Sequence, residues 1–252
     1  MIKVIAAREL KSLLLSPLAW AILAVTQIIL SYQFLSQLDA YLLLQSRLSV
    51  LDDSPGITDL VIAPLLGGAA IVLLLIVPML TMRLISDEQK NQTLPLLFSA
   101  PISMLQIVLG KYLGILAFLL LLVLMIALMP LSLLLGTPID LGQLSAALLG
   151  LSLLLASFAA AGLYMSTLTR QPAIAAISSF GLLLFLWIIN WAGNSDTASD
   201  SINVLSWFSV LTHFEPFLKG VFSTADISYY LLFILLFLVL SIRRMERLRL
   251  PH

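Results

Sequence analysis

The side chains that could carry chemistry in this chain are few and lie far apart. There is no cysteine among the 252 residues, and the two histidines are His213 and His252. This excludes thiolate metal sites and a cysteine nucleophile, and two histidines need further ligands to hold a metal. The phosphate-binding loop of nucleotide-binding proteins is absent, because Gly110 and Lys111 are followed by Tyr112. We therefore expect no catalytic, metal-binding or cofactor-binding residue in this chain.

The composition indicates a membrane protein. Charged residues make up 10% of the chain and hydrophobic residues 61%, whereas an ordinary soluble domain has roughly 25% charged residues. The polar side chains needed to cover a soluble globular fold are missing. The net charge is zero and there is no long basic tract, so we expect the lipid bilayer, and no nucleic acid, as a partner.

Six apolar runs, uncharged apart from Lys111, are present, and a helix needs about 20 predominantly apolar residues to cross the bilayer. They cover residues 17–38, 60–82, 107–135, 141–168, 173–192 and 227–242. The runs are continuously apolar, whereas a membrane β-strand alternates over about ten residues. The sequence therefore predicts an all-α integral membrane protein, in which residues 17–252 form one domain of six transmembrane helices.

Lysine and arginine are distributed unevenly between the two sides of the predicted membrane. Eleven of the 13 fall on one side, which is therefore expected to be cytoplasmic: Lys3, Arg8, Lys11, Arg83, Lys90, Lys111, Arg170, Arg243, Arg244, Arg247 and Arg249. Arg47 and Lys219 fall on the other side. Both termini are predicted to be cytoplasmic. No ionisable residue lies in the middle of a span, so ion coupling within the membrane has no visible basis, and energy for transport would come from another subunit.

Residues 1–16 are predicted to form an interfacial helix on the cytoplasmic side. Ile2, Ile5, Ala6, Leu10 and Leu13 share one face of this helix. Arg8 and Lys11 lie on the opposite face, while Glu9 falls on the apolar side and weakens the pattern. The alternative is a simple positively charged flank that fixes the topology.

The cytoplasmic loop 83–106 is the most informative segment. Ser86 with Gln89, and Ser103 with Gln106, each fit a helix-capping box. Between them, Thr93 is placed to cap a short helix that exposes apolar side chains close to two acidic residues. These apolar residues include Leu94, Leu97 and Phe98, and the acidic residues are Asp87 and Glu88. Such a helix needs a cover, which is lipid, the protein's own helices or a partner's groove.

Small residues recur at four-residue intervals in two spans. They are Gly110 and Gly114 in the third span, and Ser152, Ala156 and Ala160 in the fourth. Rows of this kind let helices approach closely in lipid, either within one chain or between two copies. On the outer side, the segment 193–226 begins polar and then becomes apolar, but it is interrupted around Pro216, which predicts short helices on the outer surface and no further span.

The loop resembles that of type-2 ATP-binding-cassette (ABC) exporter permeases, especially the gliding-motility-type and copper-processing-type subfamily. The shared features are Glu88, the step 92–95, the SAPIS turn at 99–103 and the sequence VLGKYLG at 108–114. The N-terminal sequence ARELKSLLLSPLAW at 7–20 is also similar. This chain departs from the family pattern at two positions, with Gln92 in place of glycine and Pro95 in place of glutamate.

The resemblance implies a permease subunit of an exporter in a bacterial inner membrane. Residues 87–99 would form a coupling helix in a cleft of a separate ATPase subunit, and residues 1–16 the connecting helix. The segment 193–226 would form short re-entrant helices that close the outer end of the pathway. Two permease copies, as a homodimer, would pair above two ATPases, which bind the ATP and Mg, and a periplasmic accessory protein would be a further partner. Two alternatives stay open: a secondary carrier that works without ATP, and a scaffold that recruits an ATPase to a periplasmic complex.

Overall fold

The computed structural model describes residues 1–48, 56–93, 103–137, 139–193 and 207–249, and every regular element among these residues is helical. Six helical stretches are long and apolar enough to cross a membrane, which confirms the predicted all-α, six-span fold. They are Pro17–Leu44, Thr58–Lys90, Met104–Leu135, Leu141–Leu168, Pro172–Ile189 and Thr224–Arg249. The sixth is longer than its apolar run predicts, because the helix continues through the arginines that follow.

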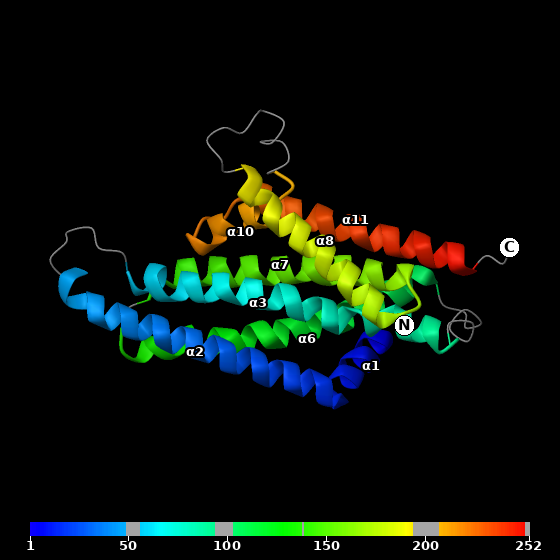
Figure 1. The fold of residues 1–252 in the computed structure, drawn as a ribbon, viewed down its shortest axis with the longest axis horizontal. Helices are drawn as coiled ribbons and strands as arrows, with labels where there is room; N and C mark the ends of the chain where they lie inside the picture. Colours follow the sequence, from blue (N-terminus) through cyan, green and yellow to red (C-terminus); the bar gives the residue numbers. More distant parts are fainter. Residues whose placement is uncertain (49–55, 94–102, 138, 194–206, 250–252) are drawn as a thin grey trace.

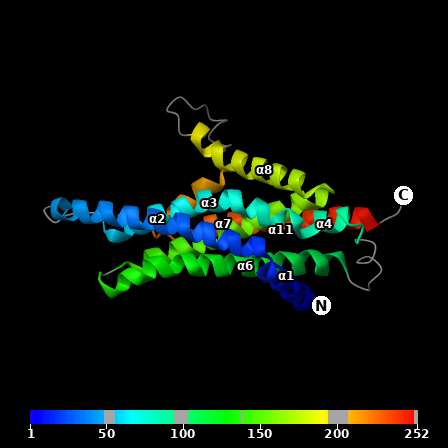
Figure 2. The same ribbon diagram turned by 60° about the horizontal axis from the view of Figure 1, so that its bottom comes forward.

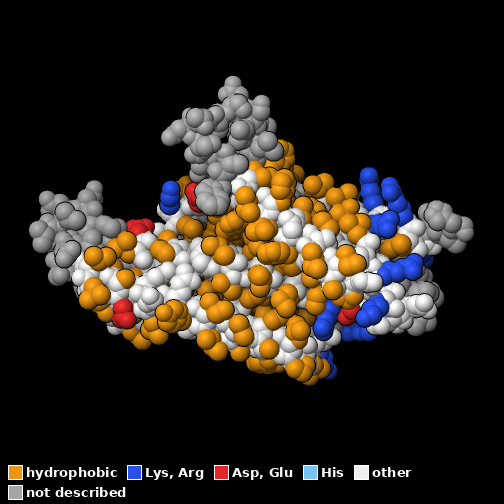
Figure 3. Space-filling view, in the orientation of Figure 1, with side chains coloured by type: hydrophobic (Ala, Val, Ile, Leu, Met, Phe, Trp, Pro, Cys, Tyr) orange, Lys and Arg blue, Asp and Glu red, His pale blue; other side chains and the backbone are white. Residues whose placement is uncertain are grey.

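The two termini lie at the same end of the bundle (Figure 1), as an even number of spans requires. Most Lys and Arg side chains gather at this end, while hydrophobic side chains cover the middle of the visible face (Figure 3). We call it the basic end and the opposite end the far end. The basic end comprises α1, α4 and the last turns of α11.

The N-terminal helix α1 (Ile2–Leu15) runs obliquely to the first span, α2 (Pro17–Leu48) (Figure 1). Ser16 between them is extended, with φ −80° and ψ 127°. Pro17 then starts α2, a position where proline's missing N–H costs nothing because the first helical N–H groups have no partner within the helix. The change of direction therefore coincides with the Ser16–Pro17 step.

The second span is built from three consecutive elements. A π-helical turn, η1 (Thr58–Ile62), leads into α3 (Ala63–Thr81), and α4 (Arg83–Lys90) follows after Met82 alone. The expected helix start at Ser86 is wrong. Ser86 lies inside α4, fully buried, and its hydroxyl donates to the Met82 carbonyl one turn earlier, because the helical hydrogen bonding of the second span simply continues.

The third span, α6 (Met104–Ser132), begins as predicted, because the Ser103 hydroxyl accepts a hydrogen bond from the Gln106 N–H at 3.3 Å. A short 3-10 turn, η2 (Leu133–Leu135), ends it. Asp140 caps the fourth span, α7 (Leu141–Leu168), in the same way. The fifth span, α8 (Pro172–Gly193), slants away from the other spans toward the far end (Figure 2).

The segment before the sixth span contains a short helix, α10 (Val210–Leu218), which is capped by Ser209. It lies at the far end, and α11 (Thr224–Arg249) then returns to the basic end (Figure 1). Phe214 and Phe217 of α10 are fully buried. One face of this helix is therefore packed against the spans.

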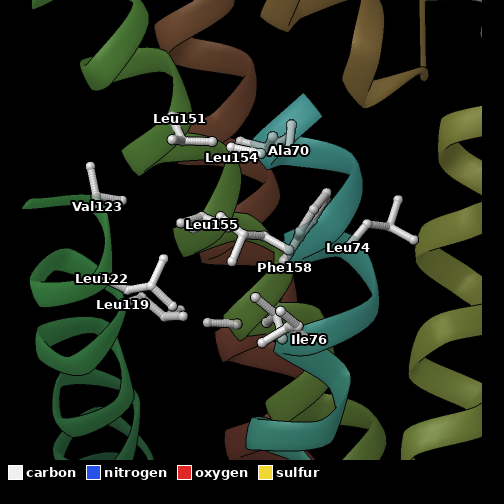
Figure 4. Close-up of a cluster of buried hydrophobic side chains, with 14 of the residues drawn as sticks. Ala70, Leu74, Ile76, Leu119, Leu122, Val123, Leu151, Leu154, Leu155 and Phe158 are labelled. Atoms are coloured by element: carbon white, nitrogen blue, oxygen red, sulfur yellow. The ribbon is translucent and has the colours of Figure 1, made fainter. Parts of the chain in front are cut away.

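The core is centred on α7, which packs against α3, α4, α6, α8, α10 and α11. Leucines of α7, such as Leu151 and Leu155, lie with Phe158 between side chains of α3 and α6 (Figure 4). Ser157, Phe158 and Ala160 have no exposed surface. The fourth span is thus surrounded by protein, whereas α2, α8 and α11 each present large apolar side chains to the outside.

Glycines allow the closest approaches to α7. A Cβ atom added at Gly162 would lie 2.1 Å from Thr81 Oγ1 of α3 and 2.8 Å from Thr81 Cβ. One added at Gly150 would lie 2.6 Å from Phe217 Cβ of α10. Both distances are far shorter than van der Waals contact. Apolar surfaces gain little by associating in lipid, so backbone-level packing of this kind holds the helices together.

We predict that Gly162→Ala destabilises the protein by about 1–3 kcal/mol, the usual range for overfilling a packed site. Thr81 is short and buried, so α3 and α7 must separate to accommodate the new methyl group. Thermal unfolding in detergent measures the effect, and Thr81→Ala in the same protein should recover part of the loss. Gly181→Ala in α8 is the matched control, because no atom lies within 4 Å of its added Cβ. An equal effect of both substitutions would contradict this account of the packing.

Candidate functional site at the basic end

Residues of three helices meet around Lys111 at the basic end: α1, α4 and the start of α6. The inner face of α1 is the predicted one, since Ile2, Ile5 and Leu10 are half-buried while Arg8 and Lys11 are exposed. Leu10 also packs against the hydrophobic core. The apolar face of residues 1–16 therefore packs against the third span of the same chain.

Helix α1 packs against α6 at Gly110 and Gly114. A Cβ atom at Gly110 would lie 2.7 Å from Ile5 Cβ, and one at Gly114 would lie 2.6 Å from Glu9 Cβ. Neither position has room for a side chain, so the N-terminal helix lies directly on the α6 backbone. In this structure the glycine pair contacts another helix of the same chain.

Lys111 lies between these two glycines and is the centre of the site. Its side chain is only 6% exposed, and its Nζ lies 2.8 Å from Glu88 Oε1 of α4. The same Nζ lies 3.5 Å from Glu9 Oε2 of α1. A buried ammonium group is costly unless it is paired and hydrogen-bonded. The two carboxylates offset that cost, and one lysine therefore links α1, α4 and α6.

A cleft of about 540 Å³ opens beside Lys111 between α1, α4 and α6. Arg8, Arg83, Asp87 and Asn91 contribute polar groups to its walls. The second carboxylate oxygen of Glu88, Oε2, is buried and has no hydrogen-bond partner among the described residues. A buried acceptor of this kind is one donor short of satisfaction. Glu88 is also one of the residues that line this cleft.

The short helix α4 is tied to the end of α7 on its other side. Ser166 Oγ accepts hydrogen bonds from the backbone N–H groups of Ile85 and Ser86, both at 3.0 Å, and donates to the Met82 carbonyl at 2.9 Å. The Gln89 side chain donates to the Thr167 carbonyl at 3.0 Å. Because Ser166 is fully buried, these bonds are shielded from water. A displacement of α4 must therefore involve α7.

The structure corrects the start of the expected helix 87–99. Asp87 and Glu88 lie on α4, which follows the second span directly, and are not the first residues of a separate helix. The chain leaves α4 at Gln92, which has a left-handed φ of 55°. Thr93 Oγ1 then donates back to the Glu88 carbonyl at 3.3 Å. Leu94, Leu97 and Phe98 lie outside the described residues.

The small residues of α7 also face the interior of the chain. Ala160 is fully buried, and Ala156 is nearly so. The Tyr112 hydroxyl of α6 donates to the Ala156 carbonyl at 3.1 Å. The third and fourth spans are thus joined by a hydrogen bond one residue away from Lys111 in sequence.

Sequence reasoning did not find Lys111 as the centre of the site. It counted this lysine only as one of the positive charges that set the orientation. The available signal was Glu9, an acidic residue on the apolar face of an amphipathic helix, which needs a positively charged partner from elsewhere. Spacing could not identify that partner, because residues 9, 88 and 111 meet only in the folded chain.

Comparison with known proteins places the chain in a family. A search of curated proteins finds no match. The sequence model of the ABC-2 family transporter proteins matches residues 3–248, nearly the whole chain, including α1, α4, α6 and the site they form. The chain therefore belongs to the ABC-2 transporter family, whose members are membrane permeases that work with separate ABC ATPase subunits.

Proposed function

We propose that this chain is the permease subunit of an ATP-driven exporter and that the basic end receives a separate ATPase subunit, which binds ATP and Mg. The sequence resemblance to gliding-motility-type and copper-processing-type permeases supports this choice within the family. In the proposed assembly two copies of the chain form a homodimer in a bacterial inner membrane. Both termini, and hence the basic end, face the cytoplasm. A periplasmic accessory protein is a further proposed partner.

The observation that carries the proposal is the ion-paired contact at Lys111. It joins the N-terminal helix, the end of the second span and the start of the third span beside an open cleft. Asp87 and Glu88, the acidic residues expected to engage the ATPase, line that cleft. The loop from Thr93 through Leu94, Leu97 and Phe98 would supply the apolar contact with the ATPase.

The way in which a movement would reach the spans follows from the hydrogen bonds of α4. An ATPase that moves α4 on binding ATP also pulls on Ser166 and on Lys111, and thereby on α7 and α6. The interior of one chain is filled by α7 and the side chains around it. We therefore place the export path between two copies of the chain, with the exposed apolar faces of the outer spans available for the partner copy or for lipid.

We predict that Glu88→Arg reduces recovery of the ATPase with the tagged permease at least tenfold. The substitution places two cations together and removes the acidic wall of the cleft, and tenfold corresponds to about 1.4 kcal/mol. The tagged chain is purified from native membranes in mild detergent. A co-purified subunit with a phosphate-binding loop is identified by mass spectrometry, and its ATP hydrolysis is measured.

Two further variants make this test specific. Glu246→Arg is the matched control, because Glu246 is exposed near the end of α11 and lies outside the cleft. Adding Glu9→Lys and Lys111→Glu to Glu88→Arg reverses all three charges, so both ion pairs are restored with opposite sign, and this variant should recover the association that depends on the position of α4. Equal co-purification and hydrolysis for the native chain and Glu88→Arg would contradict the assignment of this site. The purified permease alone should hydrolyse no ATP.

The proposed orientation is tested by labelling single cysteines in cells, since the chain has no native cysteine. Ser199→Cys, in the sequence between α8 and α10, should react with a membrane-impermeant thiol reagent added from outside. Lys90→Cys at the exposed end of α4 should react only after the membrane is opened. The opposite pattern would reverse the topology and remove the basic end from the reach of a cytoplasmic ATPase.

A further inference from the structure

A second buried ion pair lies at the far end, where α10 meets the start of α11. His213 Nδ1 of α10 lies 2.6 Å from Asp226 Oδ1 of α11. His213 is only 6% exposed and Asp226 only 8%. Neither residue takes part in the proposed ATPase site, which is at the opposite end of the bundle (Figure 1).

Both nitrogen atoms of the imidazole ring face hydrogen-bond acceptors. Nδ1 faces the Asp226 carboxylate, and Nε2 lies 3.0 Å from the backbone carbonyl oxygen of Trp207. A neutral imidazole has a single N–H group and can donate to only one of them, whereas the protonated ring donates to both. A backbone carbonyl only accepts, and the Asp226 carboxylate does the same as long as it is ionised. The geometry therefore fits the imidazolium form.

The surroundings of the ring also favour a cation. Tyr229 stacks on the imidazole with ring centroids 4.0 Å apart and planes inclined by 23°, and the Trp207 indole meets it edge to face. Aromatic faces attract cations. In the described part of the chain, the charged or titratable groups that contact the imidazole are Asp226 and Tyr229, both from α11. From α3, α7 and α8, which also pack near α10, the described residues place no such group on the ring.

The other contacts that fix α10 do not depend on this proton. The hydroxyls of Tyr229 and Tyr230 donate to the carbonyls of Phe208 and Val210 at 2.8 and 2.9 Å. At the other end of α10, the Gln143 amide donates to the Leu218 carbonyl at 2.9 Å. Phenol and amide groups do not change charge between about pH 5 and about pH 8, whereas histidine does. Among these contacts, those of His213 are thus the ones that depend on the protonation of the ring.

We propose that protonated His213 is a positioning residue that, together with the Tyr229 and Tyr230 hydroxyls, holds the N-terminal end of α10 on the sixth span, and that loss of the proton loosens this end. One of the two ring contacts then becomes a contact between two acceptors, which is repulsive. The far end of the permease is thereby sensitive to the pH of the compartment it faces. This proposal concerns the isolated chain and does not depend on an ATPase.

The test measures how accessible the start of α10 is at different pH values. Val210 is 1% exposed and Ala225 of α11 is exposed, so Val210→Cys reports release and Ala225→Cys corrects for the reagent's own pH dependence. The purified chain in lipid nanodiscs is labelled with a methanethiosulfonate reagent. Between about pH 5 and about pH 8.5 we expect the corrected rate at Val210→Cys to rise about tenfold, the scale of one lost hydrogen bond to a charged group.

Variants of the pair give distinct results. His213→Gln cannot be protonated and should label at the same corrected rate at every pH. With Asp226→Asn, Val210→Cys should be labelled faster at acidic pH than it is with the native pair. Asp226→Glu should restore the pH profile. Glu215→Gln, an exposed change on the same helix, should keep the native profile. The proposal would be overturned if the labelling rate of the His213→Gln variant varied with pH as in the native chain. It would also be overturned if the native labelling rate did not vary with pH.

A second measurement decides the matter if a variant fails to fold. The chain contains two histidines, so ¹⁵N-histidine spectra of the native chain show two residues, and His252→Gln identifies the signal of His213. We expect both ring nitrogens of His213 to carry protons at the pH values where Val210→Cys is protected. A neutral His213 in the protected state would refute the role of the proton.

Discussion

The constraint on which this structure depends is that helices in a bilayer gain little by burying apolar surface against one another. Lipid tails are as apolar as leucine side chains, so association relies on close contact and on satisfied polar groups. The contacts made by α7 follow this rule, because Gly162 admits Thr81 and Gly150 admits Phe217 at backbone level. Ser166 adds hydrogen bonds that are shielded from water. The other elements are arranged around this one buried span.

The same constraint explains why polar pairs help to hold the two short helices at opposite ends. Helix α1 lies on the α6 backbone but has no fully buried residue, and α10 has only nine residues, with one face packed against the spans. Lys111 fixes α1 through Glu9, and Asp226 fixes α10 through His213. Each pair is shielded from solvent, where its members would be costly without each other. Charge therefore specifies the position of the elements that span the least membrane.

The sequence was a good guide to features that depend on local composition. The six apolar runs predicted the spans, and the capping pattern at Ser103 predicted the start of α6, because both signals are complete within a few residues. The same capping pattern failed at Ser86, where the preceding helix did not end and Ser166 of a distant span occupied the backbone groups. Lys111 was missed for a related reason, since both of its partners come from other helices. Long-range pairing leaves only an indirect signal, such as Glu9 on an apolar face.

Helix α7 connects the two ends of the molecule. At the basic end its Ser166 holds α4, and at the far end its Gly150 lies against Phe217 of α10. Between these points α7 is one unbroken helix surrounded by other spans. If an ATPase shifts α4, the shift reaches α10 through this helix without any further moving part. By linkage, the reverse also holds. If a release of α10 favours one position of α7, it must also favour the position of α4 that accompanies it. The proton on His213 and the nucleotide on the partner subunit would then act on the same equilibrium from opposite sides of the membrane.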